Sequence, residues 1–212
     1  MTLDPPWCER CGRPSETPTA RCSGCPPPSV DTARAPFLYT GPAKAAIHRL
    51  KFSGWRGVAD ALAAAMIAVE TPAGDVVTWI PLSRRRLAER GFDQSRAIAS
   101  AVARRIDVPC VPLIRRVVAT GPQARRSASE RRSAIRGAFA PAGGRTPPRV
   151  VLVDDVLTTG ATAAACADAL REGGASCVTL LTAARAFSGA KGRDYTRAGS
   201  RPGLWLPGDP PR

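Results

Sequence analysis

The sequence predicts an α/β domain in which helices flank a parallel sheet, with a small cysteine module at the N-terminal end. Short runs of β-branched and aliphatic residues alternate along the chain with segments of helical periodicity, the order of elements that a parallel sheet requires. Four of the seven cysteines fall within the first 35 residues. The chain has 212 residues, of which 44% are hydrophobic, and this is enough for one packed core.

The composition divides the chain into three parts. Residues 1–35 hold four cysteines among Pro, Ser and Thr and show almost no apolar periodicity, which indicates a separate module. Residues 36–187 carry the alternating helix and strand patterns of the main domain. Residues 188–212 are rich in Gly, Pro and Arg, a composition that predicts a disordered tail.

Two helical stripes and two strand-like runs make up the first half of the main domain. The stripes are Val58, Leu62, Met66 and Val69, followed by Ile98, Val102 and Ile106, the second opened by Asp93 and Ser95. Val76–Ile80, which Pro81 closes, predicts a buried strand, and Val108–Val111 predicts a short one.

The second half of the main domain follows the order strand, helix, strand. Val150–Val153 is a continuous apolar run, typical of a strand buried on both faces. Ala161–Arg171 is Ala-rich and helical and is stopped by two glycines, and Cys177–Thr182 is the next strand. This order implies right-handed crossovers and a parallel sheet, whose ligands bind at the carboxyl ends of the strands.

The most informative segment is VVLVDDVLTTGAT, residues 150–162. A buried strand leads to two carboxylates, Asp154 and Asp155, which can accept hydrogen bonds from two neighbouring hydroxyls, as on a ribose. Neighbouring strand residues point to opposite faces, so we expect the strand to end before this pair if both face one ligand. The loop then opens a helix, whose first turn holds anions, and Gly160 lets the backbone approach a phosphate closely.

Two other interpretations of the acidic pair are open. A hydrophobic strand that ends in Asp also occurs as the magnesium-binding partner of a P-loop, but the chain contains no G-x-x-x-x-G-K-[ST] segment. An acidic strand end can also be a helix cap or an ion-pair site.

This segment resembles the phosphoribosyl pyrophosphate (PRPP) signature of type I phosphoribosyltransferases, and the whole chain resembles the ComF family. The matching blocks are the two Cys-x-x-Cys pairs, FLYTGPAKAAIHRLKFSG, PLSRRRLAERGFDQS, Gln123 followed by Arg131 and GAF, and the signature. The resemblance implies a type I phosphoribosyltransferase-like sheet flanked by helices, with an N-terminal four-cysteine zinc ribbon. The chain departs from the family at Asp93, Arg126 and Ala134, and its Val117–Gly137 segment would be a mobile cover over the site.

The resemblance also implies roles for individual residues. Asp154 and Asp155 would hold the ribose hydroxyls of PRPP, with Mg²⁺, and are the catalytic candidates. The 5-phosphate would be cradled by Thr158, Thr159, Gly160, Ala161 and Thr162. The family's pyrophosphate loop falls at Pro81–Arg90, where the arginines that can meet a pyrophosphate are Arg84, Arg85, Arg86 and Arg90. The alternative for this stretch is an exposed basic helix.

The N-terminal cysteines have the spacing of a paired zinc knuckle. Cys8, Cys11, Cys22 and Cys25 form two Cys-x-x-Cys pairs, and four thiolates around Zn²⁺ make a closed structural site. A segment this short has no hydrophobic core, so metal binding would supply its folding energy. Two disulfides or a redox pair are the alternatives. The other three cysteines, Cys110, Cys166 and Cys177, fall in predicted elements and are expected in the core.

The chain is strongly basic, with a net charge of +14. The basic residues are 28 Arg and 3 Lys, and residues 84–136 alone contain 14 Arg and four acids. This charge favours an anionic partner such as phosphate, nucleic acid or a lipid surface, although solvated helix faces and a GC-rich genome also produce such a skew.

The longest apolar run, Ala61–Val69, has nine residues, so no membrane insertion is expected. With no signal peptide at its start, we expect the chain in the cytoplasm.

Two functions are consistent with the sequence. The first is an enzyme, a phosphoribosyltransferase that moves the phosphoribosyl group of PRPP to an unknown acceptor. The second, which the ComF name implies, is a non-catalytic factor in DNA uptake that associates with single-stranded DNA and uses the fold as a PRPP sensor. The four tryptophans are not clustered, so the sequence shows no evident stacking platform for bases.

Overall fold

The structure is a computed structural model of the chain, and it describes residues 6–15, 17–22, 25–26, 28–53, 56–117 and 137–186. Some of the sequence predictions fall on residues outside these ranges. They concern the tail 188–212, most of the Val117–Gly137 cover, and Gln123, Arg126, Arg131 and Ala134.

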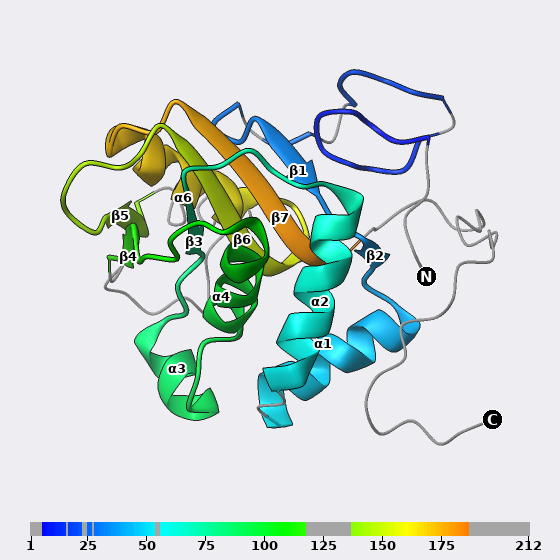
Figure 1. The fold of residues 1–212 in the computed structure, drawn as a ribbon, viewed down its shortest axis with the longest axis horizontal. Coiled ribbons are helices and arrows are strands. Elements are labelled where there is room, and N and C mark those ends of the chain that lie inside the picture. The colour runs from blue at the N-terminus through cyan, green and yellow to red at the C-terminus, as the bar shows by residue number, and fades with distance from the viewer. Residues whose placement is uncertain are drawn as a thin grey trace, which may run out of the picture.

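The main sheet is parallel throughout its described strands, as the sequence predicts (Figure 1). Its strands are β1 (Thr32–Arg34), β2 (Phe37–Leu38), β3 (Val76–Trp79), β6 (Arg149–Leu157) and β7 (Cys177–Arg185). The order across the sheet is β1, β7, β6, β3, and β2 pairs with β7 beyond β1. The two longest strands, β6 and β7, therefore lie at the centre of the sheet.

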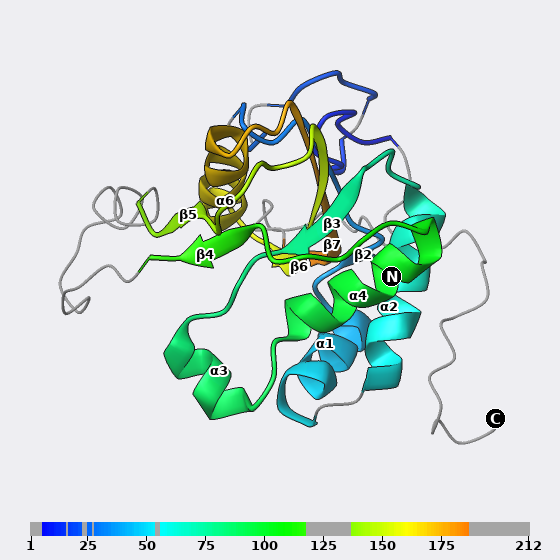
Figure 2. The ribbon, with the colours of Figure 1, turned by 60° about the vertical axis from the view of Figure 1, so that its left-hand side comes forward.

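Helices cover both faces of this sheet. Figure 2 shows α1 (Gly41–Ser53), α2 (Arg56–Val69) and α4 (Gln94–Ile106) on one side of the strands and α6 (Ala161–Glu172) on the other. The short helix α3 (Arg84–Arg90) stands away from the sheet and buries none of its residues. No helix in the described part of the chain is long and apolar enough to span a bilayer.

The continuous apolar run of β6 serves two cores. Val151 and Val153 pack into a cluster with α1, α2 and α4, whereas Val150 and Leu152 pack into a second cluster with α6. All four side chains are almost completely buried. Because side chains alternate along a strand, a strand between two helical layers is apolar at every position, which confirms the prediction of burial on both faces.

One predicted strand is reduced to a single bridge. Around Cys110, the Val77 N–H donates to the Pro109 carbonyl and the Val111 N–H donates to the Val77 carbonyl. Proline has no N–H, and Pro109 and Pro112 flank this bridge, so a longer ladder cannot form there. The chain then enters an antiparallel ribbon of β4 (Ile114–Arg116) and β5 (Phe139–Pro141).

Candidate phosphosugar site and cysteine cluster

The twin carboxylates lie inside β6, which corrects the expectation that the strand ends before them. The ladder with β7 continues through Asp154, opposite Thr182, to Leu157. Both carboxylates nevertheless meet the start of α4. Ser95 Oγ donates to Asp154 Oδ1 at 2.9 Å, and Gln94 Nε2 donates to Asp155 Oδ2 at 3.0 Å. Two consecutive residues of α4 thus hold two consecutive residues of β6.

A lysine from α1 completes this cluster. Lys51 Nζ lies 2.8 Å from Asp155 Oδ2, and the two side chains are only 17% and 9% exposed. Sequence reasoning missed Lys51, Gln94 and Ser95 as site residues. They belong to the blocks FLYTGPAKAAIHRLKFSG and RGFDQS, which carry the family resemblance, and this membership was the available signal.

Asp154 is held in an environment that disfavours its charge. Burial, followed by the charge of Asp155, raises the pKa of Asp154 to about 7. The Asp155 N–H, the Ser95 hydroxyl and the charge of Lys51 act in the opposite direction but do not compensate. A carboxyl with this pKa can exchange a proton near neutral pH, as a general base must.

The loop between β6 and α6 has the geometry of an anion site. Gly160 precedes α6 with a positive φ of 78°, a conformation that favours glycine, and as the N-cap residue it has no side chain to cap the helix. Thr159 Oγ1 accepts the Ala161 N–H at 3.4 Å. Thr158 and Thr159 are exposed, and Ala161 and Thr162 are partly exposed. The positive end of the helix is therefore accessible, next to a turn lined with hydroxyls.

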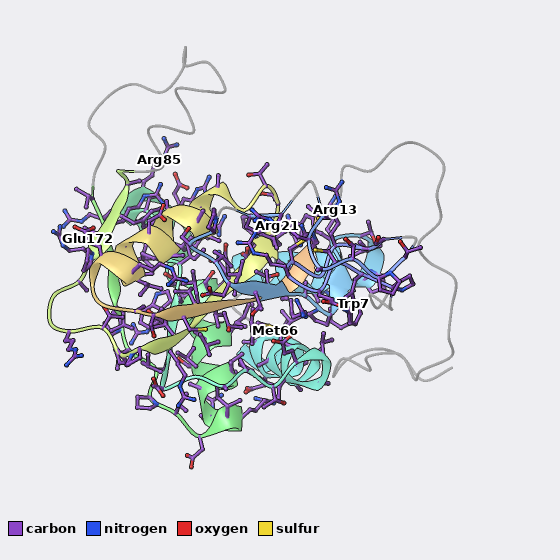
Figure 3. The ribbon with its side chains drawn as sticks, turned by 90° about the horizontal axis from the view of Figure 1, so that it is seen from above. Trp7, Arg13, Arg21, Met66, Arg85 and Glu172 are labelled. Atoms are coloured by element: carbon purple, nitrogen blue, oxygen red, sulfur yellow. The ribbon has the colours of Figure 1, made fainter. Side chains whose placement is uncertain are left out.

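The predicted pyrophosphate loop is mostly the helix α3, so the basic-helix alternative describes its conformation. Ser83 caps α3 by accepting the Arg86 N–H, and Gly91, with a φ of 73°, ends it. Arg84, Arg85 and Arg86 are exposed, and Arg85 forms an ion pair with Glu89 one turn later along the helix. Figure 3 shows Arg85 at the periphery of the molecule.

Arg90 differs from the other arginines of this segment because it is linked to the acidic cluster. Its guanidinium donates to Gln94 Oε1 at 3.1 Å, and Gln94 in turn donates to Asp155. Asp93 closes the connection before α4, since Oδ1 accepts the N–H groups of Ser95 and Arg96 while Oδ2 accepts the Leu82 N–H. The block RGFDQS is therefore the clamp that joins α4 to the twin carboxylates.

The four N-terminal cysteines form a cluster that fits a zinc ion. Their Sγ atoms all lie within 4.8 Å of one another, and the closest pairs are Cys8–Cys25 and Cys11–Cys22 at 3.5 Å and Cys22–Cys25 at 3.7 Å. A tetrahedral site with Zn–S bonds of about 2.3 Å requires sulfur atoms about 3.8 Å apart. The cysteines are free rather than disulfide-bonded, which agrees with the zinc interpretation.

The other cysteines take no part in this cluster. Cys166 of α6 is buried in the core, as expected, while Cys110 and Cys177 are half-buried. Within the cluster, burial raises the pKa of the Cys11 thiol to about 12, and the charge of Arg185 acts in the opposite direction. Bound metal would favour the thiolate form of these side chains.

Comparisons with known proteins show the family to which the chain belongs. Residues 93–199 match the family model "Phosphoribosyl transferase domain". The DNA utilization protein YhgH of Salmonella typhi is 32% identical over 189 residues, 82% of this chain and 81% of that protein. Competence protein F of Haemophilus influenzae is 28% identical over 195 residues, 85% of each chain.

A solved structure of glutamine PRPP amidotransferase from B. subtilis aligns with 59% of this chain at 26% identity, with a TM-score of only 0.42. This chain corresponds to 26% of that structure's length.

The parallel sheet, the acidic strand and the glycine turn before α6 define a protein of the phosphoribosyltransferase type. The chain belongs to this domain family, within the ComF group that includes competence protein F and the YhgH proteins.

Proposed function

We propose that this protein binds PRPP at the end of β6 and transfers its phosphoribosyl group to an acceptor that the sequence does not identify. The observation that carries this proposal is the continuity of one segment, in which two carboxylates are followed within a few residues by an accessible helix start. The carboxylates are suited to ribose hydroxyls and the helix start to the 5-phosphate, so one ligand of this class would satisfy both.

The proposed reaction joins an acceptor nitrogen to the anomeric carbon of PRPP. The carbon–oxygen bond to pyrophosphate breaks, its electron pair leaves with the pyrophosphate, and the nitrogen gives its proton to a base. Asp154, with a pKa of about 7, is suited to take this proton. Mg²⁺ bound with PRPP would neutralise charge on the leaving group, and the oxygen donors of Asp154 and Asp155 are of the kind that Mg²⁺ prefers.

Calorimetry with PRPP and Mg²⁺ tests the ligand. We expect the double variant Asp154→Asn, Asp155→Asn to lose measurable PRPP binding, because amides cannot replace two carboxylates as acceptors for the ribose hydroxyls. Asp60→Asn is the matched control, since Asp60 is a half-exposed carboxylate on α2 that pairs with Arg104. An unchanged affinity in the double variant would remove the site assignment. Pyrophosphate release with a panel of nitrogen acceptors then tests the transfer itself.

The names of the relatives support a second candidate, association with single-stranded DNA. The exposed Arg84 and Arg86 of α3 are available to bind phosphates. We expect Arg84→Gln, Arg86→Gln to weaken oligonucleotide binding and to reduce the slope of log K against log salt by roughly 0.7 for each phosphate no longer neutralised. Arg104→Gln is the control, because Arg104 is already paired with Asp60. An unchanged slope would exclude α3 as the DNA-binding element.

A further inference from the structure

The cysteine module is linked to the strand side of the phosphate loop, residues 158–160, through an arginine of β7. Leu157, the last residue of β6, lies opposite Arg185 in the ladder with β7. The Arg185 side chain is buried, and its guanidinium donates to the Cys11 carbonyl. One arginine therefore joins the backbone of a cluster cysteine to the point where the loop leaves the sheet.

The same module contacts the loop on its helix side. Pro26 directly follows Cys25, and a Cβ placed at Gly160 would lie 3.4 Å from Pro26 Cβ. The position of Pro26 is fixed in turn by Arg10, whose guanidinium donates to the carbonyls of Pro26 and Val30 at 2.7 and 2.6 Å.

The contact continues into α6. Ser29 Oγ donates to the Ala164 carbonyl at 3.4 Å, in the first turn of the helix. The described part of the module thus lies next to the helix end of the three-residue loop and is linked to its strand end through Arg185.

We propose that the cysteine module is part of the phosphate site, and that Arg185 and Pro26 are positioning residues that hold the two ends of the loop. Metal in the cysteine cluster and a phosphosugar in the loop then bind cooperatively. This inference rests on the proposed function, because it takes the loop to be the place where the 5-phosphate binds.

The physical reason is linkage between two sites that share one ordered segment. The module is too short for a core of its own, so metal is what keeps Pro26 and the Cys11 carbonyl in place. With the metal bound, the loop is already ordered and the ligand does not lose that conformational freedom on binding. Linkage is reciprocal, so a bound phosphosugar must raise the affinity for metal by the same factor.

The test measures the zinc affinity of the full chain by equilibrium competition with a chelator, with and without saturating ribose 5-phosphate. We expect the sugar phosphate to raise the zinc affinity about tenfold, within the usual range for coupled sites. In Arg185→Lys and in Pro26→Gly, zinc and ribose 5-phosphate should each still bind. The ratio of the zinc affinity with ribose 5-phosphate to the zinc affinity without it should fall below about twofold. A merely structural role would lower both zinc affinities and leave their ratio unchanged.

Two controls complete the experiment. Arg21→Gln changes an exposed arginine of the same module and should keep the full ratio (Arg21 is labelled in Figure 3). The double variant Asp154→Asn, Asp155→Asn should not bind the sugar phosphate. Any change in zinc affinity that the sugar phosphate still causes in this variant comes from direct chelation of zinc. One outcome is that ribose 5-phosphate binds the native chain in calorimetry while the zinc affinity of the chain stays the same. In that case the coupling is wrong and the proposed function stands. If ribose 5-phosphate does not bind, the coupling fails, and calorimetry with PRPP and Mg²⁺ decides the proposed function separately.

Discussion

At the scale of single residues, the site is organised by competition between charges. Asp155 has a cationic partner in Lys51 and an amide donor in Gln94, whereas Asp154 has the hydroxyl of Ser95 and a carboxylate neighbour. Two adjacent acids therefore have different environments. The result is one carboxylate in an ion pair and another carboxyl whose pKa is raised to about 7 by burial and by its acidic neighbour.

The raised pKa of Asp154 predicts a pH-dependent stability difference. The folded state binds this proton more tightly than the unfolded state, so the protonated carboxyl contributes stability at low pH that is lost as the pH rises from about 4 to about 7. We expect Asp154→Asn, which cannot ionise, to raise Tm relative to the native chain, and more at pH 8.5 than at pH 5. Each pKa unit corresponds to about 1.4 kcal/mol.

Thermal unfolding at the two pH values measures this difference. The groups that face Asp154 are Asp155, Lys51 and Ser95, with Cys166 from α6, and none of them is altered in the variant. Asp60→Asn serves as the control, because Asp60 lies on the surface, and its small effect should not show this pattern. The same Tm difference for Asp154→Asn at both pH values would contradict the charge-based explanation.

At the scale of elements, the decisive unit is β6, the loop and α6. The strand is fixed by its ladder with β7, and the helix starts at a glycine whose φ of 78° few other residues adopt. Pro26 and Leu157 both lie within 4 Å of the point where a Cβ on that glycine would be. The phosphate loop is therefore short, has both ends anchored, and has little freedom to adopt another conformation.

Gly160→Ala tests the importance of this turn. We expect the free energy of unfolding to fall by about 1–2 kcal/mol, because a residue with a Cβ is strained at positive φ. Relief of this strain would shift the backbone of the phosphate loop, so PRPP affinity should fall by more than the loss of stability explains. Gly57→Ala is the matched control, because Gly57 lies in α2 with nothing near its missing Cβ. There the same change should stabilise the chain by up to about 1 kcal/mol. Equal effects at the two positions, measured by denaturant unfolding and calorimetry, would remove the special role of the turn.

The sequence predicts the three longest strands of the main sheet and three of its helices because each carries its own local pattern; these elements are β3, β6, β7, α2, α4 and α6. It fails to predict that β6 continues through two aspartates, because carboxylates are depleted from strands and only pairing with β7 extends the ladder. The ion pair between Lys51 and Asp155 joins residues far apart in the chain, which no local pattern reveals. The helix α3 was within reach of prediction, since a serine cap and a terminal glycine bracket it.

At the scale of the whole molecule, the cysteine module and the main domain share structure. β1, which the sequence assigns to the module, is a strand of the main sheet and pairs with β7. Asp31 accepts hydrogen bonds from the Val178 N–H and from Arg171 of α6. Val30 and Ala33 are almost completely buried in the core beside α6. The module is therefore continuous with the domain that it precedes.

Two deletions test this continuity. Removing residues 1–35 takes away β1 and uncovers the edge of β7, whereas removing residues 1–27 keeps β1 and Val30. We expect the longer deletion to unfold at least about 5 °C below the shorter one, since burial of a single Val is worth about 1.5–3 kcal/mol. It should also aggregate more readily, because an open strand edge pairs with other chains. Equal Tm values and equal solubility would show that the boundary lies at residue 35 after all.

The ion pair between Lys51 and Asp155 has a consequence for which sugars the protein admits. A pentose whose hydroxyls donate to Asp155 competes with Lys51 for the carboxylate oxygens and weakens the ion pair of a largely buried ammonium group. Only a ligand that carries a negative charge can compensate Lys51 for the weakened ion pair. Free ribose and uncharged nucleosides bring no such charge. We therefore expect the Lys51–Asp155 ion pair to disfavour their binding.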